Sequence, residues 1–357
     1  MLTYIVRRIL LMIPTLIGIT MVVFFTMAMS PGGVGAALAG AEGNMRPQER
    51  EAVRKYLNQR YGLDQPAILQ YFRWLNQISP VGFHVNEDGS YGRFTLKWPS
   101  LGESLMRRRP VTSVVAEALP ITLLLNVITI PIIYAISITA GIRAAQHRGK
   151  RFDIGVGTTM VALWSLPVMW VGVMAIGFVA NREYLYLFPT GGLHDTLATR
   201  MSYLPGYVNG EFRIGYLLDL AWHLVLPVIC LTYGGFAVMT KLMRASVLEN
   251  ITADFARTAR AKGLPERVVI YRHVLRNSIL PLITVAASIL PGLLGGSVIV
   301  ESIFSIDGMG RLMIDAINTR DRDLILSITL VSGLLSLSCL IVADICYAIA
   351  DPRVSYE

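Results

Sequence analysis

Six long apolar stretches constrain this chain more than any other feature of its sequence. A helix needs roughly 20 mainly apolar residues to cross the hydrocarbon core of a bilayer. The six stretches cover residues 9–29, 121–141, 154–180, 224–243, 279–303 and 324–350. Charged residues make up only 16% of the 357-residue chain, against about 25% in soluble domains. We therefore predict an all-α membrane protein with six transmembrane helices.

The first stretch has an alternative interpretation as a secretory signal peptide, because two arginines precede it and Ala37-Leu38-Ala39 loosely resembles a cleavage site. However, its apolar run is longer than the 7–15 residues of a signal-peptide core. We therefore predict that it is retained as the first transmembrane helix, residues 1–29.

Lysine and arginine in the short connections set the orientation of a membrane protein, with the positive side facing the cytoplasm. The loop at 142–153 and the loop at 241–278 are both rich in these residues, as is the N-terminus. Both termini are therefore predicted to be cytoplasmic, including a tail at 351–357. Residues 30–120 then form an extracytoplasmic segment, and residues 121–350 form a five-helix core with a cytoplasmic loop at 244–278.

The extracytoplasmic segment carries its own structural signals. Helices are predicted from Pro47 to about Tyr61 and from about Pro66 to Ile78, since proline favours the start of a helix and Gly62 follows the first one. Residues 81–97 are predicted to form a hairpin around Asp88-Gly89. Within the spans, prolines indicate either bent helices around a pathway or ordinary proline use in membrane helices; they are Pro14, Pro131, Pro167, Pro227 and Pro291.

Motifs for catalysis and nucleotide binding are missing from the sequence. Gly149-Lys150 is followed by Arg151 and preceded by no P-loop glycine pattern, so the chain lacks that phosphate cradle. H-E-x-x-H, C-x-x-C and G-x-S-x-G are also missing. The five histidines have no metal-ligand spacing, and the three cysteines lie in apolar runs typical of core positions. We expect no enzyme active site, no metal and no cofactor in this chain.

Ionisable residues at membrane depth are costly and are therefore candidates for function. Asp344 lies in the last span and Glu301 lies near the end of the fifth. Asp219 and His223 stand at the start of the fourth. Interfacial positions for Glu301 and Asp219, and an interhelical hydrogen bond for Asp344, explain these residues more simply. Glu301 and Asp344 remain weak pathway candidates.

The cytoplasmic loop predicts a short helix that ends abruptly. Asn250 or Thr252 can cap its start, and Asp254 favours its positive end. Gly263 can adopt the left-handed conformation that terminates a helix, before Pro265 starts the next one. Small residues at 256, 259 and 261 allow another surface to approach closely. The residues themselves leave two interpretations equally open: a docking helix for a partner, or a solvated loop with topology-setting charge.

The same loop carries a family resemblance. The stretch 257–264, Arg-Thr-Ala-Arg-Ala-Lys-Gly-Leu, resembles the cytoplasmic motif of the permease subunits of bacterial dipeptide and oligopeptide ABC importers. Other matching stretches span nearly the whole chain: Tyr61–Pro66, Leu294–Ser297, Glu301–Phe304, Gly308–Leu312, Arg320-Asp321 and Asp351–Arg353. Ser30–Gly33 and Phe188–Gly192 resemble the Yej-type subgroup. The sequence departs from the family at Arg257, Asp307 and 321–323, and has a longer insertion around 80–98.

The resemblance implies a type I ABC importer permease fold and a non-catalytic subunit in the bacterial inner membrane. It implies four kinds of partner: a second homologous permease, two ATPase subunits that bind ATP and Mg²⁺, an extracytoplasmic peptide-binding protein, and membrane lipid. No nucleic acid is expected. The residues that it assigns to ATPase coupling are Asp254, Phe255, Arg257, Thr258, Ala259, Arg260, Lys262, Gly263 and Leu264. The alternatives are a proton-coupled secondary transporter or channel that uses Asp344 or His223, and a membrane scaffold or receptor that moves no solute.

Overall fold

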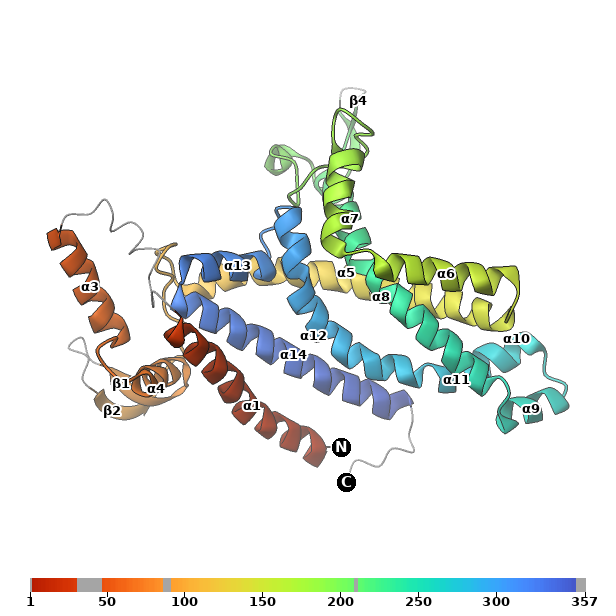
Figure 1. Cartoon of the computed structure of the whole chain (residues 1–357), viewed down its shortest axis with the longest axis horizontal. Helices are drawn as coiled ribbons and strands as arrows, with labels where there is room; N and C mark the ends of the chain where they lie inside the picture. The colour runs from red at the N-terminus through yellow and green to blue at the C-terminus, as the bar shows by residue number, and fades with distance from the viewer. Residues whose placement is uncertain (1, 31–46, 86–90, 209–210, 351–357) are drawn as a thin grey trace. The chain divides into compact units, whose positions relative to one another are not determined.

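The computed structural model describes residues 2–30, 47–85, 91–208 and 211–350, and most of them are helical (Figure 1). The chain divides into two compact units. One holds Leu2–Leu119 and Leu312–Leu335, and the other holds Pro120–Arg311 and the residues from Ser336 onward. The hairpin turn at Asp88-Gly89, the stretch Pro31–Gly33 and the tail at 351–357 lie outside the described residues.

The N-terminal unit contains α1 (Leu2–Met29), α3 (Pro47–Tyr61) and α4 (Ala67–Ile78). Strands β1 (Val81–Val85) and β2 (Tyr91–Leu96) pair in an antiparallel hairpin. Gly62 follows α3 with φ +63°, and Pro66 precedes α4. The two helices and the hairpin that the sequence predicts after the first span are therefore confirmed.

A buried polar cluster in this unit ties the segment after α1 to the start of α14 (Arg322–Ala350). Arg322 and Asp323 are 3% and 2% exposed. Arg60 Nη2 lies 3.4 Å from Asp323 Oδ2, and the Arg322 guanidinium lies over the Tyr61 ring, 4.4 Å from its centroid. Cation–π contacts strengthen when the cation is withdrawn from water. The departure from the family pattern at 321–323 therefore serves to hold this segment in place.

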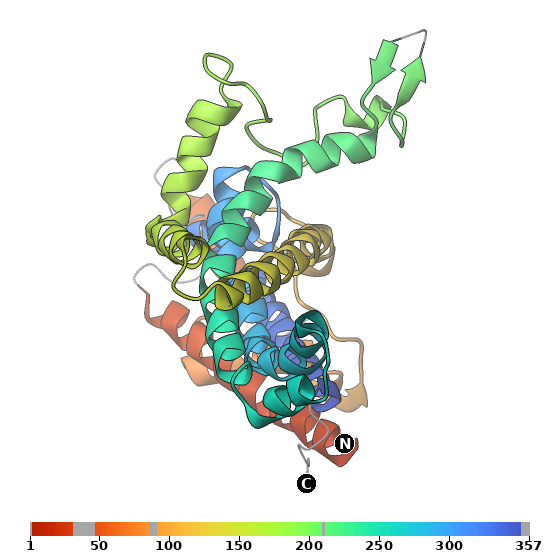
Figure 2. The same ribbon diagram turned by 90° about the vertical axis from the view of Figure 1, so that its right-hand side faces the viewer.

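The core unit contains most of α5 (Val111–Gln146), then α6 (Arg151–Ser165), α7 (Val168–Met174) and the π-helix η2 (Ala175–Ala180) (Figure 2). After an outer block with η3 (Ala198–Arg200), β3 (Gly206–Val208) and β4 (Glu211–Arg213), α8 runs from Tyr216 to Asn250. Short helical pieces follow: α9 (Asp254–Ala261), α10 (Glu266–Val268), η4 (Val269–Val274) and α11 (Leu275–Ser278). The unit continues with α12 (Leu280–Ile303), and α13 (Met309–Thr319) begins at its end.

Prolines act differently along the spans. At Pro167 the chain turns by 89° between α6 and α7, because proline cannot donate the hydrogen bond that would continue the helix. The Tyr233 hydroxyl donates to the Leu166 carbonyl at 2.8 Å, so a carbonyl at the bend is satisfied from α8. Pro14, Pro131 and Pro227 lie inside unbroken helices. Bending is thus confirmed at Pro167.

Five helices in the described part of the chain are long and apolar enough to cross a membrane, and the bent pair α6–α7 supplies a sixth crossing if it counts as one span. The predicted spans are all helical, but α5 and α8 extend beyond 121–141 and 224–243. One of the five candidate spans is Glu266–Val285, which is formed by α10, η4, α11 and the start of α12. Residues 244–250 of the predicted loop belong to α8.

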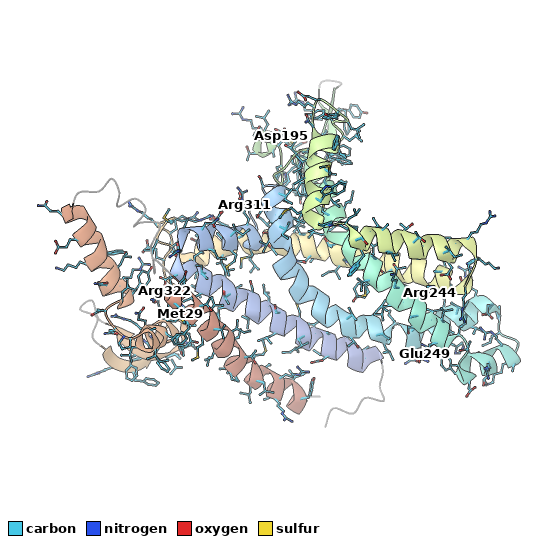
Figure 3. The ribbon with its side chains drawn as sticks, viewed as in Figure 1. Met29, Asp195, Arg244, Glu249, Arg311 and Arg322 are labelled. Carbon is cyan, nitrogen blue, oxygen red and sulfur yellow. The ribbon has the colours of Figure 1, made fainter. Side chains whose placement is uncertain are left out.

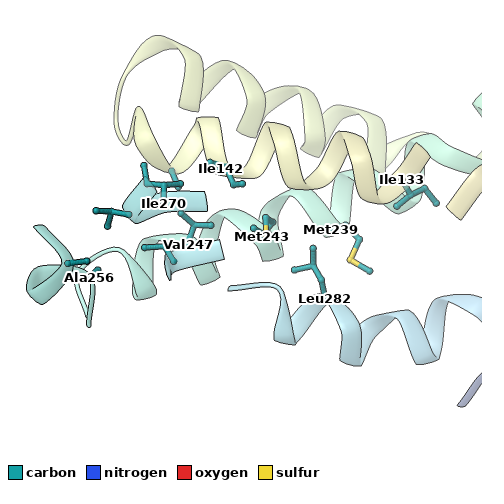
Figure 4. Close-up of a cluster of buried hydrophobic side chains, with 12 residues drawn as sticks. Ile133, Ile142, Met239, Met243, Val247, Ala256, Ile270 and Leu282 are labelled. Carbon is teal, nitrogen blue, oxygen red and sulfur yellow. The ribbon is translucent and has the colours of Figure 1, made fainter. Parts of the chain in front are cut away.

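One apolar core joins the short helical pieces α9 and η4 to the long helices of the core unit (Figure 4). It consists of side chains from α5, α8, α9, η4 and α12: Ile133, Ile142, Ala145, Met239, Met243, Val247, Ala256, Ala259, Val269, Ile270, Val274 and Leu282. Since protein interiors are close-packed, a displacement of one of these elements is transmitted to the others. The short helix α9 therefore packs in the same core as the long helices α5, α8 and α12.

Candidate functional site

Helix α9 presents two different faces. Ala256 and Ala259 are 0% and 5% exposed, and they pack into the core described above (Figure 4). On the other face, the side chains of Asp254 and Arg257 are 99% and 72% exposed, and Phe255 is 37% exposed. The small residues at 256 and 259 were expected to let a partner's surface approach closely. Instead, they pack against other helices of this chain. The outward face is instead charged and aromatic.

Gly263 closes α9 in the left-handed conformation that the sequence predicts. Its φ is +77°, its N–H donates to the Arg260 carbonyl at 2.9 Å, and the Leu264 N–H donates to the Ala259 carbonyl at 3.3 Å. These two bonds form a Schellman motif, which satisfies carbonyls that the helix end would otherwise leave unpaired. The predicted stop at Gly263 is confirmed.

The predicted caps at the other end of α9 are wrong. Asn250 is the last residue of α8, and the Thr252 hydroxyl donates backwards to the Glu249 carbonyl at 3.0 Å. Ala253 occupies the N-cap position without a side-chain bond. Because α8 runs further than its apolar pattern indicates, both polar residues belong to its end rather than to the start of α9.

Arg260 braces α9 internally. Its guanidinium donates to both carboxylate oxygens of Glu266 at 2.9 and 2.7 Å, and to the Ile251 carbonyl at 2.9 Å. The hydrogen bonds that Arg260 donates to the Glu266 carboxylate raise the pKa of Arg260. This bidentate geometry fixes the planar guanidinium. Arg260 therefore connects Ile251, just after α8, to Glu266 at the start of α10. Arg260 is therefore engaged within the chain, whereas Arg257 is free to face outward.

A second ion pair stiffens the same end of the core unit, and the sequence alone did not predict it. Arg244 on α8 donates from Nη2 to Asp153 Oδ2 of α6 at 2.7 Å (Figure 3). The Gly149 N–H donates to the same oxygen at 2.9 Å. Asp153 is 6% exposed. The sequence interpretation counted Arg244 only as topology-setting charge, but it also fastens the loop between α5 and α6 to α8.

Glu301 is fully buried within the chain, and the membrane depth expected for it stays a prediction. Its carboxylate accepts hydrogen bonds from the Thr122 hydroxyl and from the Arg311 N–H, both at 2.9 Å. A Cβ on Gly308 would come within 2.5 Å of Glu301 Cδ, so the glycine makes room for the carboxylate. Anions stabilise a helix N-terminus, and Glu301 occupies that place at the start of α13. Within this chain Glu301 therefore holds the loop before α13 in place, and its role in a pathway stays a prediction.

Asp219 is the centre of a polar cluster that the sequence showed only in part. Its two carboxylate oxygens lie 3.3 Å from His194 Nδ1 and 3.4 Å from His223 Nδ1, and it accepts the Asp195 N–H at 3.0 Å. Its side chain is 9% exposed, so the carboxylate is sheltered within the chain, and the membrane depth expected for it stays a prediction. His194 was missed, because 25 residues separate it from Asp219. The signal that was present is the i, i+4 spacing of Asp219 and His223 on one helix.

A cavity of ≈ 620 Å³ adjoins this cluster. His194, His223, Asp195 and Arg182 are among the residues that line it, and Asp195 lies in the outer block beyond α7 (Figure 3). The backbone N–H of Leu197 lowers the pKa of Asp195, which keeps that carboxylate charged. The cavity therefore offers both charge signs and hydrogen-bonding groups to a polar solute.

Asp344 lies on α14 and is half-buried. Its role in the pathway stays a prediction, as does that of the stretch 294–297, whose side chains lie outside the described residues. Among the residues that the structure describes, no three His, Cys, Asp or Glu side chains are arranged to hold a metal ion.

Long apolar helices, a core that fastens the short helix α9 to them and a cavity beside the Asp219 cluster are the features of a multi-pass membrane permease. Comparison with known proteins agrees. The chain belongs to the family described as the inner membrane component of binding-protein-dependent transport systems, whose model matches residues 137–356. The model for the N-terminal part of such membrane components matches residues 1–126. The protein is thus an inner-membrane permease with the type I ABC permease fold.

Three relatives match over nearly their whole length. The oligopeptide transport system permease protein AppB of Bacillus subtilis is 34% identical over 357 residues, with 100% of both chains covered. The di/tripeptide transport system permease protein DppB of Pseudomonas aeruginosa is 32% identical, with 100% of both chains covered. The inner membrane ABC transporter permease protein YejB of Escherichia coli is 30% identical, with 99% of both chains covered.

Proposed function

We propose that this chain is one of two permease subunits of an ATP-driven peptide importer, and that α9 is the element on which a cytoplasmic ATPase acts. The peptide assignment follows the oligopeptide and di/tripeptide permeases that it resembles along its full length. A second permease would complete the pathway. Two ATPase subunits would bind ATP and Mg²⁺, and an extracytoplasmic binding protein would deliver the peptide.

The single observation that carries the proposal is the division of α9 into two faces. Ala256 and Ala259 join it to the core, while Phe255 and Arg257 face away from the chain. A partner that grips the outward face would move the spans through the inward one, because the core between them is close-packed. A helix needed only for topology would have no reason to be anchored in this way.

The outer cavity supports a polar solute of modest size. Its walls include histidines, a charged aspartate and an arginine, so they can meet the amide groups and charged ends of a short peptide. Contacts of this kind are weak and tolerant of sequence, which suits a pathway that has to release what it binds.

Charge reversal on the outward face tests the proposal. In Arg257→Glu we expect ATPase subunits that co-purify with the wild-type chain at physiological salt to be lost or reduced at least tenfold, about 1.4 kcal/mol of binding free energy. Arg260→Glu would break the internal brace to Glu266 and is therefore no clean test of docking.

The matched control is Arg151→Glu, a charge reversal at the exposed first residue of α6, on the same predicted side of the membrane. It is expected to leave ATPase recovery unchanged. Equal ATPase recovery with Arg257→Glu and the wild type, across a salt series, would contradict docking through this face.

The rival function is proton-coupled transport, and the buried Asp219 between His194 and His223 is the observation that favours it. Uptake that follows an imposed proton gradient in vesicles without ATP, and that fails in Asp219→Asn, would establish it. The importer instead predicts uptake that depends on ATP and persists when the gradient is collapsed.

A further inference from the structure

The hairpin β1–β2 leaves its apolar side exposed. The register pairs Val81 with Leu96 and Phe83 with Phe94, so these four side chains share one face. Their exposed fractions are 46%, 82%, 47% and 63%. In a sheet with one wet face, the apolar side chains normally point into the core. Here they are exposed instead, and three of them line a groove shared with α4.

The backbone of strand β1 is hydrogen-bonded to α4. Asn76 on α4 donates to the Phe83 carbonyl at 2.9 Å and accepts the Phe83 N–H at 2.8 Å. A Cβ at Gly82 would run into the Asn76 side chain, so that face has room only for glycine. The arrangement is inverted relative to a water-soluble protein and matches what a lipid environment selects.

Helix α4 fixes the depth of this element along α1. The Tyr71 hydroxyl donates to the Ile17 carbonyl at 3.0 Å and lies 3.0 Å from the Thr20 hydroxyl. Thr20 is nine residues before Met29, the end of α1. At 1.5 Å per residue this is roughly 13 Å, close to half of a hydrocarbon core of about 30 Å. Since 9–29 is the membrane-spanning stretch, α4 lies beside its outer half, within the outer leaflet.

An apolar groove opens between α4 and the hairpin. It has a volume of ≈ 500 Å³, and Phe72, Leu75, Phe83 and Phe94 line it. Phe72 is 53% exposed, which makes the groove continuous with the outward apolar face. Its walls suit an unbranched hydrocarbon chain.

We propose that α4 and the β1–β2 hairpin are embedded in the outer leaflet, with the acyl chain of a phospholipid in the groove between them. The segment after the first span is thus in part an interfacial membrane anchor. This inference rests on the depth of Tyr71 and the inverted hairpin, and it is independent of the peptide substrate and of ATP.

Fluorescence quenching tests the embedding. A fluorescent amino acid, acridonylalanine, replaces Phe94 in the full chain, which is reconstituted with its co-purifying subunits in phosphatidylethanolamine–phosphatidylglycerol nanodiscs. The same residue at Lys150, exposed in the loop between α5 and α6, is the aqueous control. Lipids with brominated acyl chains are expected to quench position 94 strongly and position 150 hardly at all, and aqueous iodide is expected to do the reverse.

Quenching of position 94 by iodide without quenching by brominated lipid would place the hairpin in water and overturn the inference. Quenching by neither would show that another subunit covers this face, which also overturns it.

The groove has its own test. Val81→Trp fills it, whereas Leu96→Trp alters the directly paired residue, which lies outside the groove lining. Native mass spectrometry after detergent washing is expected to show one bound phospholipid fewer in Val81→Trp than in Leu96→Trp and the wild type. Equal lipid retention in all three would remove the bound acyl chain from the proposal.

Discussion

Helix α9 and the α4–hairpin element are both small pieces attached to long helices, yet they expose opposite chemistry. Helix α9 buries two alanines and exposes Asp254 and Arg257. The hairpin pairs its polar groups with Asn76 and exposes Phe94 and Leu96. The alanines of α9 are therefore buried, whereas the apolar side chains of the hairpin are exposed. The difference indicates that α9 is built to meet water or a protein, whereas the hairpin is built to meet lipid.

The largest effect is expected from filling the inward face of α9. Ala259→Leu forces extra volume between α9 and the core, and overpacking of this kind costs about 1–3 kcal/mol. Because α9 would be displaced, we expect at least a tenfold loss of ATP-dependent peptide uptake in proteoliposomes. Ala261→Leu, at an exposed position of the same helix, is the control and should transport normally. Comparable uptake by the two variants would show that the anchoring of α9 does not matter.

A smaller effect is expected from the C-terminal stop of α9. Gly263→Val places a β-branched residue at φ +77°, where an L-residue costs roughly 1–2 kcal/mol. We expect peptide uptake to fall several-fold while ATP hydrolysis continues, because the subunits still associate but the motion is no longer transmitted.

Gly149→Val is a closely matched control for that change. Gly149 has φ +74°, and a Cβ at either glycine would meet nothing within 4 Å. The two variants therefore carry similar backbone strain in different loops. If Gly149→Val uncouples hydrolysis from uptake as strongly as Gly263→Val, the effect is general strain and α9 has no special role.

The smallest effect is expected on the hairpin. Leu96→Asp places a carboxylate on the outward face, which near a membrane interface costs about 1 kcal/mol. We expect a lower melting temperature for the reconstituted protein, by a few degrees. Thr95→Asp, on the adjacent strand position facing the other way, should change the melting temperature less. A higher melting temperature in Leu96→Asp would indicate that this face is in water.

Local patterns predicted much of this molecule because they depend on neighbours in the sequence. The stop at Gly263, the helix that ends before Gly62 and the hairpin over 81–97 all follow from turn and cap chemistry that acts within a few residues. The long apolar runs predicted the spans for the same reason.

Contacts between residues far apart in the chain could not be predicted from the sequence. The burial of Glu301 depends on Thr122, which is 179 residues away, and the Asp153–Arg244 pair joins residues 91 apart. The inward face of α9 was also assigned wrongly, since in a helix of eight residues the alanines fit an outside surface as well as the chain's own core. For Glu301, the only local hint was the pair of glycines at 308 and 310, which leave space for its carboxylate.

Site-specific photo-cross-linking at Phe255 tests the central claim most directly. A benzoylphenylalanine at this outward position of α9, in the full chain in its native membrane, is irradiated, and the cross-linked products are identified by mass spectrometry. The account predicts a cross-link to a P-loop ATPase, which disappears in the Arg257→Glu background. Cross-links only to further copies of this chain, with no ATPase recovered at any salt concentration, would contradict it.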